Sequence, residues 1–420
     1  MKVYLETLGC RLNESEIESM ARQFAGAGHE IVSQPDSADL CVLNTCAVTQ
    51  DAVRSSRQRV RQINRAQPTA QIVVTGCYAH LSPAEVMALP GVAQVIDNTQ
   101  KDRLVPLVMR EPMDAEPIAL DYMPGALGHT RAFVKVQDGC DNRCTFCITT
   151  VARGVGRSRP LDEVVAEIQA MAQAGYKEAV LTGVQLGSYG ERAGGLRDLI
   201  HAILSDTDMP RIRLSSLEPW DLDEAFFALW ENPRLCPHLH LPLQSGCDAT
   251  LKRMLRRTDQ VSYRALIAMA RAAIPNVALS TDVIVGFPGE SDDEFAISEA
   301  FIAEMDFMKL HVFPYSARPG TAAERMRNHV DVALRKTRAE RLRAISEAGD
   351  RRYRERLSGR VSDVLWENVI GASEQGWLNS GLNGYYVRVY WTGPRVLTNT
   401  LTPALLGGLE RDGLSIRNFV

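Results

Sequence analysis

Long hydrophobic runs are missing from this 420-residue chain. No uncharged apolar stretch reaches about 18 residues, the length of a membrane-spanning helix, and no apolar segment follows Met1 as it would in a secretion signal. We therefore expect a cytoplasmic protein with no membrane partner. Internal repeats of solenoid period and low-complexity tracts are also missing, which argues against a repeat architecture.

The chain also lacks an excess of charge of either sign. Its 47 Lys and Arg face 51 Asp and Glu, which gives a formal net charge of −4, so the strongly basic balance of many nucleic-acid-binding proteins is absent. Contact with nucleic acid must therefore come from local patches. The segment 52–67 holds five arginines and no acidic residue, and we take Arg54, Arg57 and Arg61 as candidate RNA contacts. A solvated helix face is the alternative.

Strand-like and helical patterns alternate in the first quarter of the chain. The expected strands are at 2–8, 39–43, 71–75 and 92–96, and the expected helices are at 14–26, 51–65 and 83–89. This alternation predicts a small open parallel α/β sheet, to which we assign residues 1–110. Prolines and glycines without a clear period then indicate a linker at 111–130.

A longer series of the same kind follows the linker. Its expected strands are at 132–137, 178–182, 211–215, 238–243, 278–285 and 307–313, with helical patterns at 161–174, 222–230, 263–273 and 292–305. Six β/α units favour a partial (β/α)6 barrel over a second open sheet. We assign it residues 131–357, including a long arginine-rich helix at 332–356.

The sequence pattern changes in the last part of the chain. Short β-like runs at 361–366 and 385–390 are separated by glycines. They predict a small all-β domain at 358–420. The expected fold class is therefore α/β, with an all-β domain at the carboxyl end.

Six of the nine cysteines fall into two sets of three. Cys140, Cys144 and Cys147 form a CxxxCxxC loop after the first expected barrel strand, on the face where such barrels carry their active sites. The other three follow expected strands of the first sheet, where ligands gather at the strand ends; they are Cys10, Cys46 and Cys77.

The two sets suggest two metal centres that each lack one protein ligand. An iron–sulfur cluster normally takes four cysteines, so three leave one iron free for a reactant. A zinc knuckle or an accidental cluster of structural thiols is the alternative for the loop. Buried small hydrophobic residues are the alternative for the spaced set.

Several segments resemble the radical S-adenosylmethionine methylthiotransferases. They are TLGC at 7–10, NTCAVT at 44–49, GCYA at 76–79, CDNRCTFC at 140–147, RLSSLEP at 213–219, LQSGCDATLKRM at 243–254 and DVIVGFPGE at 282–290. The resemblance covers essentially the whole chain. It implies a barrel of the radical S-adenosylmethionine type and a terminal RNA-binding domain of the TRAM type.

The family has three branches that matter here. One modifies isopentenyladenosine in tRNA, one modifies an aspartate of a ribosomal protein, and one modifies threonylcarbamoyladenosine in tRNA. NTCAVT, RLSSLEP and LHVFPYSARPGT at 310–321 are most similar to the third branch. We therefore expect a methylthio group to be inserted at C2 of that adenosine. A non-catalytic RNA-binding protein with structural metal sites is the alternative of another class.

The resemblance also implies cofactors and a division of labour. Two [4Fe-4S] clusters are expected, with S-adenosyl-L-methionine cleaved to a 5′-deoxyadenosyl radical at Cys140, Cys144 and Cys147, and with sulfur held at the spaced cysteines. The expected partners are a tRNA substrate, a reductant protein and a sulfur donor.

Polar residues and a glycine near later strand ends are candidate cofactor contacts, with loop hydrogen bonds and helix caps as the alternative. They are Thr182, Gly183, Glu218, Gln244 and Asp282. His240 alternates with leucines on a strand and is expected to be structural.

Overall fold

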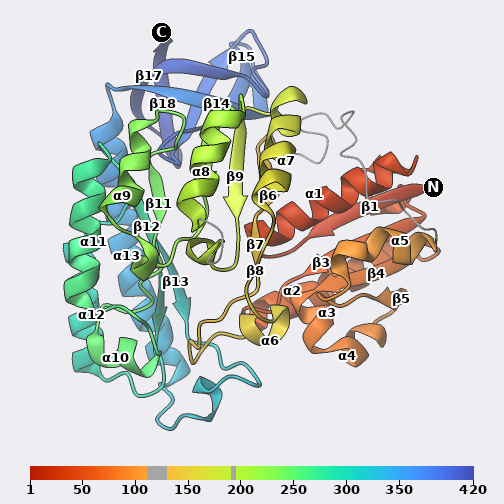
Figure 1. Cartoon of the computed structure of the whole chain (residues 1–420), viewed down its shortest axis with the longest axis horizontal. Helices are drawn as coiled ribbons and strands as arrows, with labels where there is room; N and C mark the ends of the chain where they lie inside the picture. The colour runs from red at the N-terminus through yellow and green to blue at the C-terminus, as the bar shows by residue number, and fades with distance from the viewer. Residues whose placement is uncertain (111–129, 191–194) are drawn as a thin grey trace.

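The structure is a computed structural model that describes residues 1–110, 130–190 and 195–420. The linker expected at 111–130 lies outside these residues except for Thr130. Figure 1 shows two α/β regions side by side, with a small β-barrel above the larger one. No helix in the described ranges combines the length and apolarity needed to cross a membrane.

The amino-terminal region is an open parallel sheet with the strand order β2-β1-β3-β4-β5. Its strands are β1 (Lys2–Thr7), β2 (Glu30–Val32), β3 (Leu40–Thr45), β4 (Gln71–Gly76) and β5 (Val92–Val95). Its helices are α1 (Arg11–Gly26), α2 (Gln50–Ala66), α3 (Cys77–Leu81), α4 (Pro83–Met87) and α5 (Leu104–Met109).

Helices cover both faces of this sheet, which explains the continuous apolar run of β3. Leu40 and Val42 pack into one core, whereas Cys41 and Leu43 pack into the other. A central parallel strand buried on both faces needs apolar residues at every position. The predicted open sheet is confirmed.

The central region is a partial barrel of six parallel strands. They are β6 (Ala132–Lys135), β9 (Glu178–Thr182), β10 (Arg211–Leu214), β11 (His238–His240), β12 (Ala278–Val285) and β13 (Lys309–Pro314). Two three-stranded sheets, β10-β9-β6 and β11-β12-β13, meet through isolated bridges from Ile212 to Leu235 and from Ser216 to His240. Among the described pairings none joins β6 to β13, so the barrel is open there.

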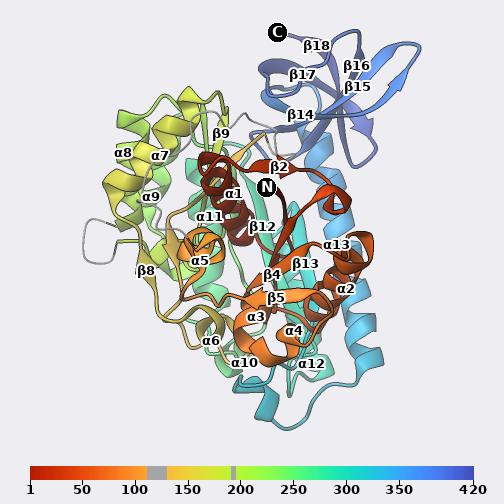
Figure 2. The ribbon, with the colours of Figure 1, turned by 90° about the vertical axis from the view of Figure 1, so that its right-hand side faces the viewer.

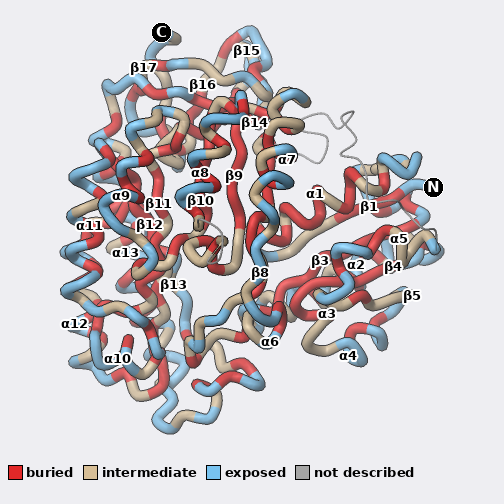
Figure 3. Tube along the Cα trace, in the orientation of Figure 1, coloured by how far each residue is buried: buried red, intermediate tan, exposed pale blue. Residues whose placement is uncertain are grey.

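Helices connect the barrel strands on the outside. They are α6 (Thr149–Arg153), α7 (Leu161–Gln173), α8 (Gly195–Asp206), α9 (Glu224–Phe227), α10 (Asp248–Arg253), α11 (Gln260–Ala273), α12 (Asp292–Glu304) and α13 (Val332–Leu357). A hairpin of β7 (Gln137–Asp138) and β8 (Arg157–Ser158) follows β6. Figure 3 shows the strands mostly buried and the outer helices partly exposed. The expected partial (β/α)6 barrel is confirmed.

Short 3₁₀ helices complete the two α/β regions. They are η1 (Pro35–Ser37), η2 (Lys101–Arg103), η3 (Leu186–Ser188), η4 (Pro219–Asp221), η5 (Ala228–Glu231) and η6 (Ala323–Arg325). The helix expected at 222–230 is α9 followed by η5 and not one continuous helix.

The carboxyl-terminal region is a closed barrel with the order β14-β15-β16-β18-β17. Its strands are β14 (Val361–Ser373), β15 (Gly376–Asn383), β16 (Arg388–Gly393), β17 (Leu401–Glu410) and β18 (Gly413–Phe419). The strand expected at 385–390 begins later, at Arg388, because Tyr385 and Tyr386 form the turn between β15 and β16 and Tyr386 has a φ of 65°. The all-β character itself is confirmed.

The small barrel covers the amino ends of the central strands. Arg131, just before β6, pairs with Glu367 at 2.8 Å, and Asn399 donates to the carbonyl of Gly175, just before β9, at 3.1 Å. Arg213 of β10 donates to backbone carbonyls of the β15–β16 turn. The carboxyl ends of the central strands point the other way (Figure 1).

Candidate functional site

The CxxxCxxC loop lies at the carboxyl end of β6, as expected. The β7–β8 hairpin closes its base, and the Cys140 N–H donates to the Gly154 carbonyl at 3.0 Å. Gly139, with a φ of 73°, precedes the loop, and a Cβ there would lie 1.9 Å from the carbonyl oxygen of Val155. Only glycine fits this turn.

Groups from distant elements face the three thiols of this loop. Arg256 Nη1 lies 3.7 Å from the Cys144 sulfur, and Gln185 Oε1 lies 3.3 Å from the Cys140 sulfur. The Thr149 N–H donates to the Cys147 sulfur at 3.4 Å. A guanidinium and an amide N–H stabilise negative charge on sulfur. Cys144 and Cys147 thus each face a donor that stabilises a thiolate, whereas the Cys140 thiol donates to Gln185.

In the absence of a bound metal group, burial favours the protonated form of these thiols. It raises the pKa of Cys140 to about 11 and that of Cys46 to about 11. Cysteine binds metal as the thiolate, so binding of a metal group displaces these protons.

The spaced cysteines meet at one edge of the amino-terminal sheet. Cys10 follows β1 as the residue before α1, Cys46 follows β3, and Cys77 opens α3 directly after β4. The charges of Cys10 and Cys77 both act on Cys46. A Cβ on Gly9 would lie 2.8 Å from the Cys46 sulfur. The missing side chain therefore leaves room beside that sulfur.

Arg153 is a buried cation next to the spaced cysteines. Its guanidinium donates to Glu16 at 2.9 Å and to Asn13 at 2.7 Å, and Asn13 Oδ1 lies 3.8 Å from the Cys10 sulfur. Burial alone would lower the pKa of Arg153, but Glu16, Cys77 and Asp138 outweigh it and raise it. The site therefore holds a fixed positive charge where thiolates would gather.

Helix α6 brings the two cysteine sets together. It begins two residues after Cys147 and ends at Arg153, which contacts α1. Asn98 Nδ2 donates to the Ala152 carbonyl at 2.6 Å and lies 3.9 Å from the Cys77 sulfur. A short segment of chain thus joins both sets across the contact between the two α/β regions (Figure 2).

The candidate cofactor contacts divide into two groups. Glu218 lies close to the CxxxCxxC loop, because its carboxylate pairs at 2.8 Å with the Arg256 that faces Cys144. Gly183 approaches Gln137 closely, since a Cβ there would lie 3.1 Å from its Oε1. Gln137 Nε2 in turn donates to the Gly139 carbonyl at 2.8 Å.

The other three candidates are engaged elsewhere. The hydroxyl of Thr182 donates to the Val134 carbonyl at 3.2 Å. Gln244, with a φ of 75°, is held by backbone hydrogen bonds to β12. Asp282 lies within β12, where its carboxylate is 3.3 Å from His240 Nε2. Burial alone would raise the pKa of Asp282, but His240 lowers it overall.

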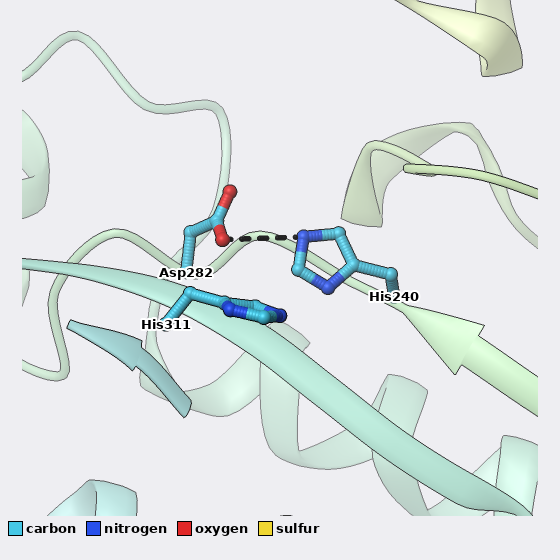
Figure 4. Close-up of side chains that lie close together, drawn as sticks. All are labelled: His240, Asp282 and His311. Carbon is cyan, nitrogen blue, oxygen red and sulfur yellow. Dashed lines mark ion pairs between the residues drawn. The ribbon is translucent and has the colours of Figure 1, made fainter. Parts of the chain in front are cut away.

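Four polar residues at these sites were not predicted from the sequence. They are Arg153, Gln185, Arg256 and His311. Arg256 lies 112 positions from Cys144, and no local spacing relates two residues that only the barrel brings together. His240 was expected to be structural, but its ring pairs with Asp282 and lies near His311 (Figure 4).

The three candidate RNA contacts lie on α2 and differ in their surroundings. Arg57 pairs with Glu85 at 2.6 Å, and Arg54 pairs with Asp51 at 3.5 Å on the surface. Arg61 is exposed and has no ion pair with any residue of the described ranges. The arginines of this stretch are thus partly neutralised by Asp51 on the same helix and by Glu85 on α4.

Comparisons with known proteins agree with this architecture. A family model described as "Uncharacterized protein family UPF0004" matches residues 2–97, and the "Radical SAM superfamily" model matches residues 134–302. Among solved structures, the radical S-adenosylmethionine methyltransferase TsrM from Kitasatospora setae aligns with a TM-score of 0.56 and 14% identity, covering 77% of each chain. This likeness shows the fold.

Relatives of similar length share much more sequence. The threonylcarbamoyladenosine tRNA methylthiotransferase MtaB of Bacillus subtilis is 38% identical over 93% of this chain and 90% of its own. The protein of the same name from Thermotoga maritima is 37% identical over 94% of this chain and 92% of its own.

The tRNA-2-methylthio-N(6)-dimethylallyladenosine synthase of Maricaulis maris is 32% identical over 99% of this chain and 96% of its own. Membership of the Radical SAM superfamily implies S-adenosylmethionine and a [4Fe-4S] cluster as cofactors. The chain, a transferase, belongs to the radical S-adenosylmethionine methylthiotransferases.

Proposed function

We propose that this protein inserts a methylthio group at C2 of N6-threonylcarbamoyladenosine next to the anticodon of tRNA. The main observation behind this proposal is that two sets of three cysteines lie on either side of α6. A C2–H bond of adenine is not acidic or electrophilic enough for an ordinary base or nucleophile at neutral pH. Relatives named for this substrate support the choice.

The donor sets fit the cofactors proposed. Cys140, Cys144 and Cys147 would hold one [4Fe-4S] cluster, and the spaced set of Cys10, Cys46 and Cys77 would hold a second. Bound S-adenosylmethionine supplies the 5′-deoxyadenosyl radical that removes hydrogen from C2.

The surrounding side chains would tune and position these groups. Arg256 and Arg153 each place a cation beside one thiolate set and offset its negative charge. Glu218 holds Arg256 in place. Thr182, Gly183, Gln244 and Asp282 remain proposed contacts of the cofactor or of the nucleoside.

The domains would divide the work. Residues 1–110 would supply sulfur, 131–357 would carry the radical chemistry, and 358–420 would bind tRNA, with 111–130 as the connection. Arg54, Arg57 and Arg61 would contact phosphates near the spaced cysteines. A reductant protein and a sulfur donor complete the reaction, which would take place where tRNA is found, in the cytoplasm.

The isopentenyladenosine derivative is the second candidate substrate, because relatives named for it are 32% and 33% identical. Mass spectrometry of nucleosides from tRNA of cells with and without the gene separates the two. Loss of methylthio-threonylcarbamoyladenosine alone is expected. Loss of the methylthio-isopentenyl nucleoside instead would identify isopentenyladenosine as the substrate. No change in either nucleoside would reject tRNA methylthiolation.

A further inference from the structure

Three polar side chains form a compact group on neighbouring strands of the central barrel. His240, Asp282 and His311 come from the neighbouring strands β11, β12 and β13, and each offers a ligand atom within 4.8 Å of the others (Figure 4). Strand register explains the meeting, since His240 lies opposite Ser280 and Asp282 lies opposite His311.

The distances suit a metal ion. Ligand atoms bound to one ion at about 2.1 Å lie about 3.0 to 3.5 Å from each other. His240 Nε2 and Asp282 Oδ1 are already 3.3 Å apart. The His311 ring is exposed and meets the His240 ring edge-on, with centroids 5.4 Å apart. A small rotation of His311 would therefore complete the triangle.

The hydrogen bonds around His240 occupy Nδ1 and leave Nε2 as the nitrogen for metal binding. Its Nδ1 lies 2.9 Å from the Ser280 hydroxyl, and that hydroxyl donates to the Leu239 carbonyl at 3.4 Å. The same hydroxyl lies 3.3 Å from His238 Nε2. When His240 Nδ1 donates to the Ser280 oxygen, Nε2 is the nitrogen that would bind a metal, in place of the proton that it shares with Asp282. A second-shell hydrogen bond of this kind orients metal-binding histidines in many sites.

We propose that His240, Asp282 and His311 bind one divalent transition-metal ion. Two imidazoles and one carboxylate suit Mn²⁺, Fe²⁺ or Zn²⁺ and leave further coordination positions open toward the barrel interior. The proposed site uses none of the six motif cysteines, and it gives Asp282 a metal-binding role in place of the proposed contact with the cofactor or the nucleoside.

Titration of the cluster-loaded protein with Mn²⁺ under anaerobic conditions tests the site. Cluster loading keeps the six motif thiols occupied, and the electron paramagnetic resonance signal of free Mn²⁺ reports the unbound fraction. The wild-type protein is expected to bind one Mn²⁺ per chain. His311→Ala is expected to weaken binding at least about tenfold, and Ser280→Ala is expected to weaken it by about 10- to 100-fold.

His201→Ala is the matched control, because His201 is an exposed histidine on α8, far from the three ligands in sequence. It is expected to bind Mn²⁺ like the wild type. Cluster absorbance and circular dichroism verify that each variant is folded. A wild-type protein without saturable Mn²⁺ binding would overturn the proposal, and so would His311→Ala binding as tightly as His201→Ala.

Discussion

Arg11 Nη2 donates a hydrogen bond of 2.6 Å to the phenolic oxygen of Tyr386, 375 positions away in the chain. Arg11 directly follows Cys10, whereas Tyr386 lies at the β15–β16 turn of the terminal barrel. The Tyr386 ring also stacks on His238, with centroids 4.7 Å apart. This hydrogen bond thus connects the terminal barrel to the residue that follows Cys10 of the spaced set.

Tyr386→Phe tests how much this contact stabilises the assembly. Burial alone would raise the pKa of Tyr386, but the guanidiniums of Arg11, Arg131 and Arg213 lower it overall. Removing the hydroxyl removes a hydrogen bond to a charged group, which costs about 1.5 to 3 kcal/mol. Calorimetry should show a lower unfolding temperature. Tyr385→Phe, the neighbour with no side-chain hydrogen bond to a described residue, should leave it unchanged.

Substitutions in the two cysteine sets should have different effects on the reaction. Cys140→Ala is expected to abolish formation of 5′-deoxyadenosine, because the cofactor needs that cluster for cleavage. Cys46→Ala is expected to retain cleavage and to stop methylthio insertion. Chromatography of the reaction products and nucleoside mass spectrometry measure both. Cys41→Ala, a buried cysteine outside both sets, should retain both activities, and loss of cleavage in Cys46→Ala would contradict the division of labour.

Arg153→Met should impair loading of the second cluster. The substitution leaves the buried Glu16 with Lys101 as its remaining cation, at 2.7 Å, and breaking a buried ion pair costs about 3 to 5 kcal/mol. Iron in the reconstituted protein should fall from about eight atoms per chain to about four. The control is Arg157→Met, which removes a half-exposed guanidinium 3.9 Å from Asp138. Equal iron in the two variants would argue against this role.

Glu18 makes the contact between α1 and the barrel sensitive to pH. Burial raises its pKa from 4.5 to about 8, and its Oε2 accepts only a long hydrogen bond of 3.4 Å from the Phe133 N–H. The folded protein therefore binds this proton more tightly than the unfolded chain, and the resulting stability is lost as the pH rises from about 4.5 to about 8.

Glu18→Gln removes this proton-dependent penalty. The variant should unfold a few degrees above the wild type at pH 8 and should match it more closely at pH 5. Glu163→Gln, an exposed site on α7, should shift neither value. An equal shift at both pH values would show that Glu18 does not titrate as proposed.

The arginines of α2 should contribute unequally to tRNA binding. Arg61→Ala should weaken binding and reduce the slope of log affinity against log salt by roughly 0.7 to 0.9. Arg57→Ala should change the slope less, because Glu85 already neutralises that guanidinium. Filter binding across salt concentrations measures both, with the outward Arg264→Ala as control. Equal slopes for Arg61→Ala and Arg264→Ala would remove α2 from the interface.

Much of the fold follows from local pattern. The strands β1, β3 and β4 each contain a short buried apolar run, at 3–5, 40–43 and 72–74, so their positions and the cysteines after them were predictable. The short strand Glu30–Val32 was missed because three residues with one charge carry too little periodicity. The tyrosines of the β15–β16 turn were misassigned because aromatic residues favour strands, whereas packing against His238 and Arg11 decides this turn.

The cysteines were the clearest part of the site in the sequence, and Glu218 was the predicted polar residue that pairs with the arginine beside Cys144. The spacing of the cysteines is a local property of the chain, and their positions at strand ends follow from the fold class. The charges around them come from elsewhere: Arg153 meets Glu16 across 137 positions, and Arg256 meets Glu218 across 38. The first pair depends on the packing of one α/β region on the other, and the second depends on the closure of the central barrel. No sequence window contains that information.

The terminal barrel and the CxxxCxxC loop lie at opposite ends of the central strands. If the terminal barrel binds the tRNA, as proposed, this separation would set the minimum size of a productive substrate, because an RNA bound there would have to extend along the molecule before its modified base reached Cys140, Cys144 and Cys147. A free nucleoside or a trinucleotide would touch one end only. Turnover should therefore rise steeply with oligonucleotide length and level off once the fragment spans both ends.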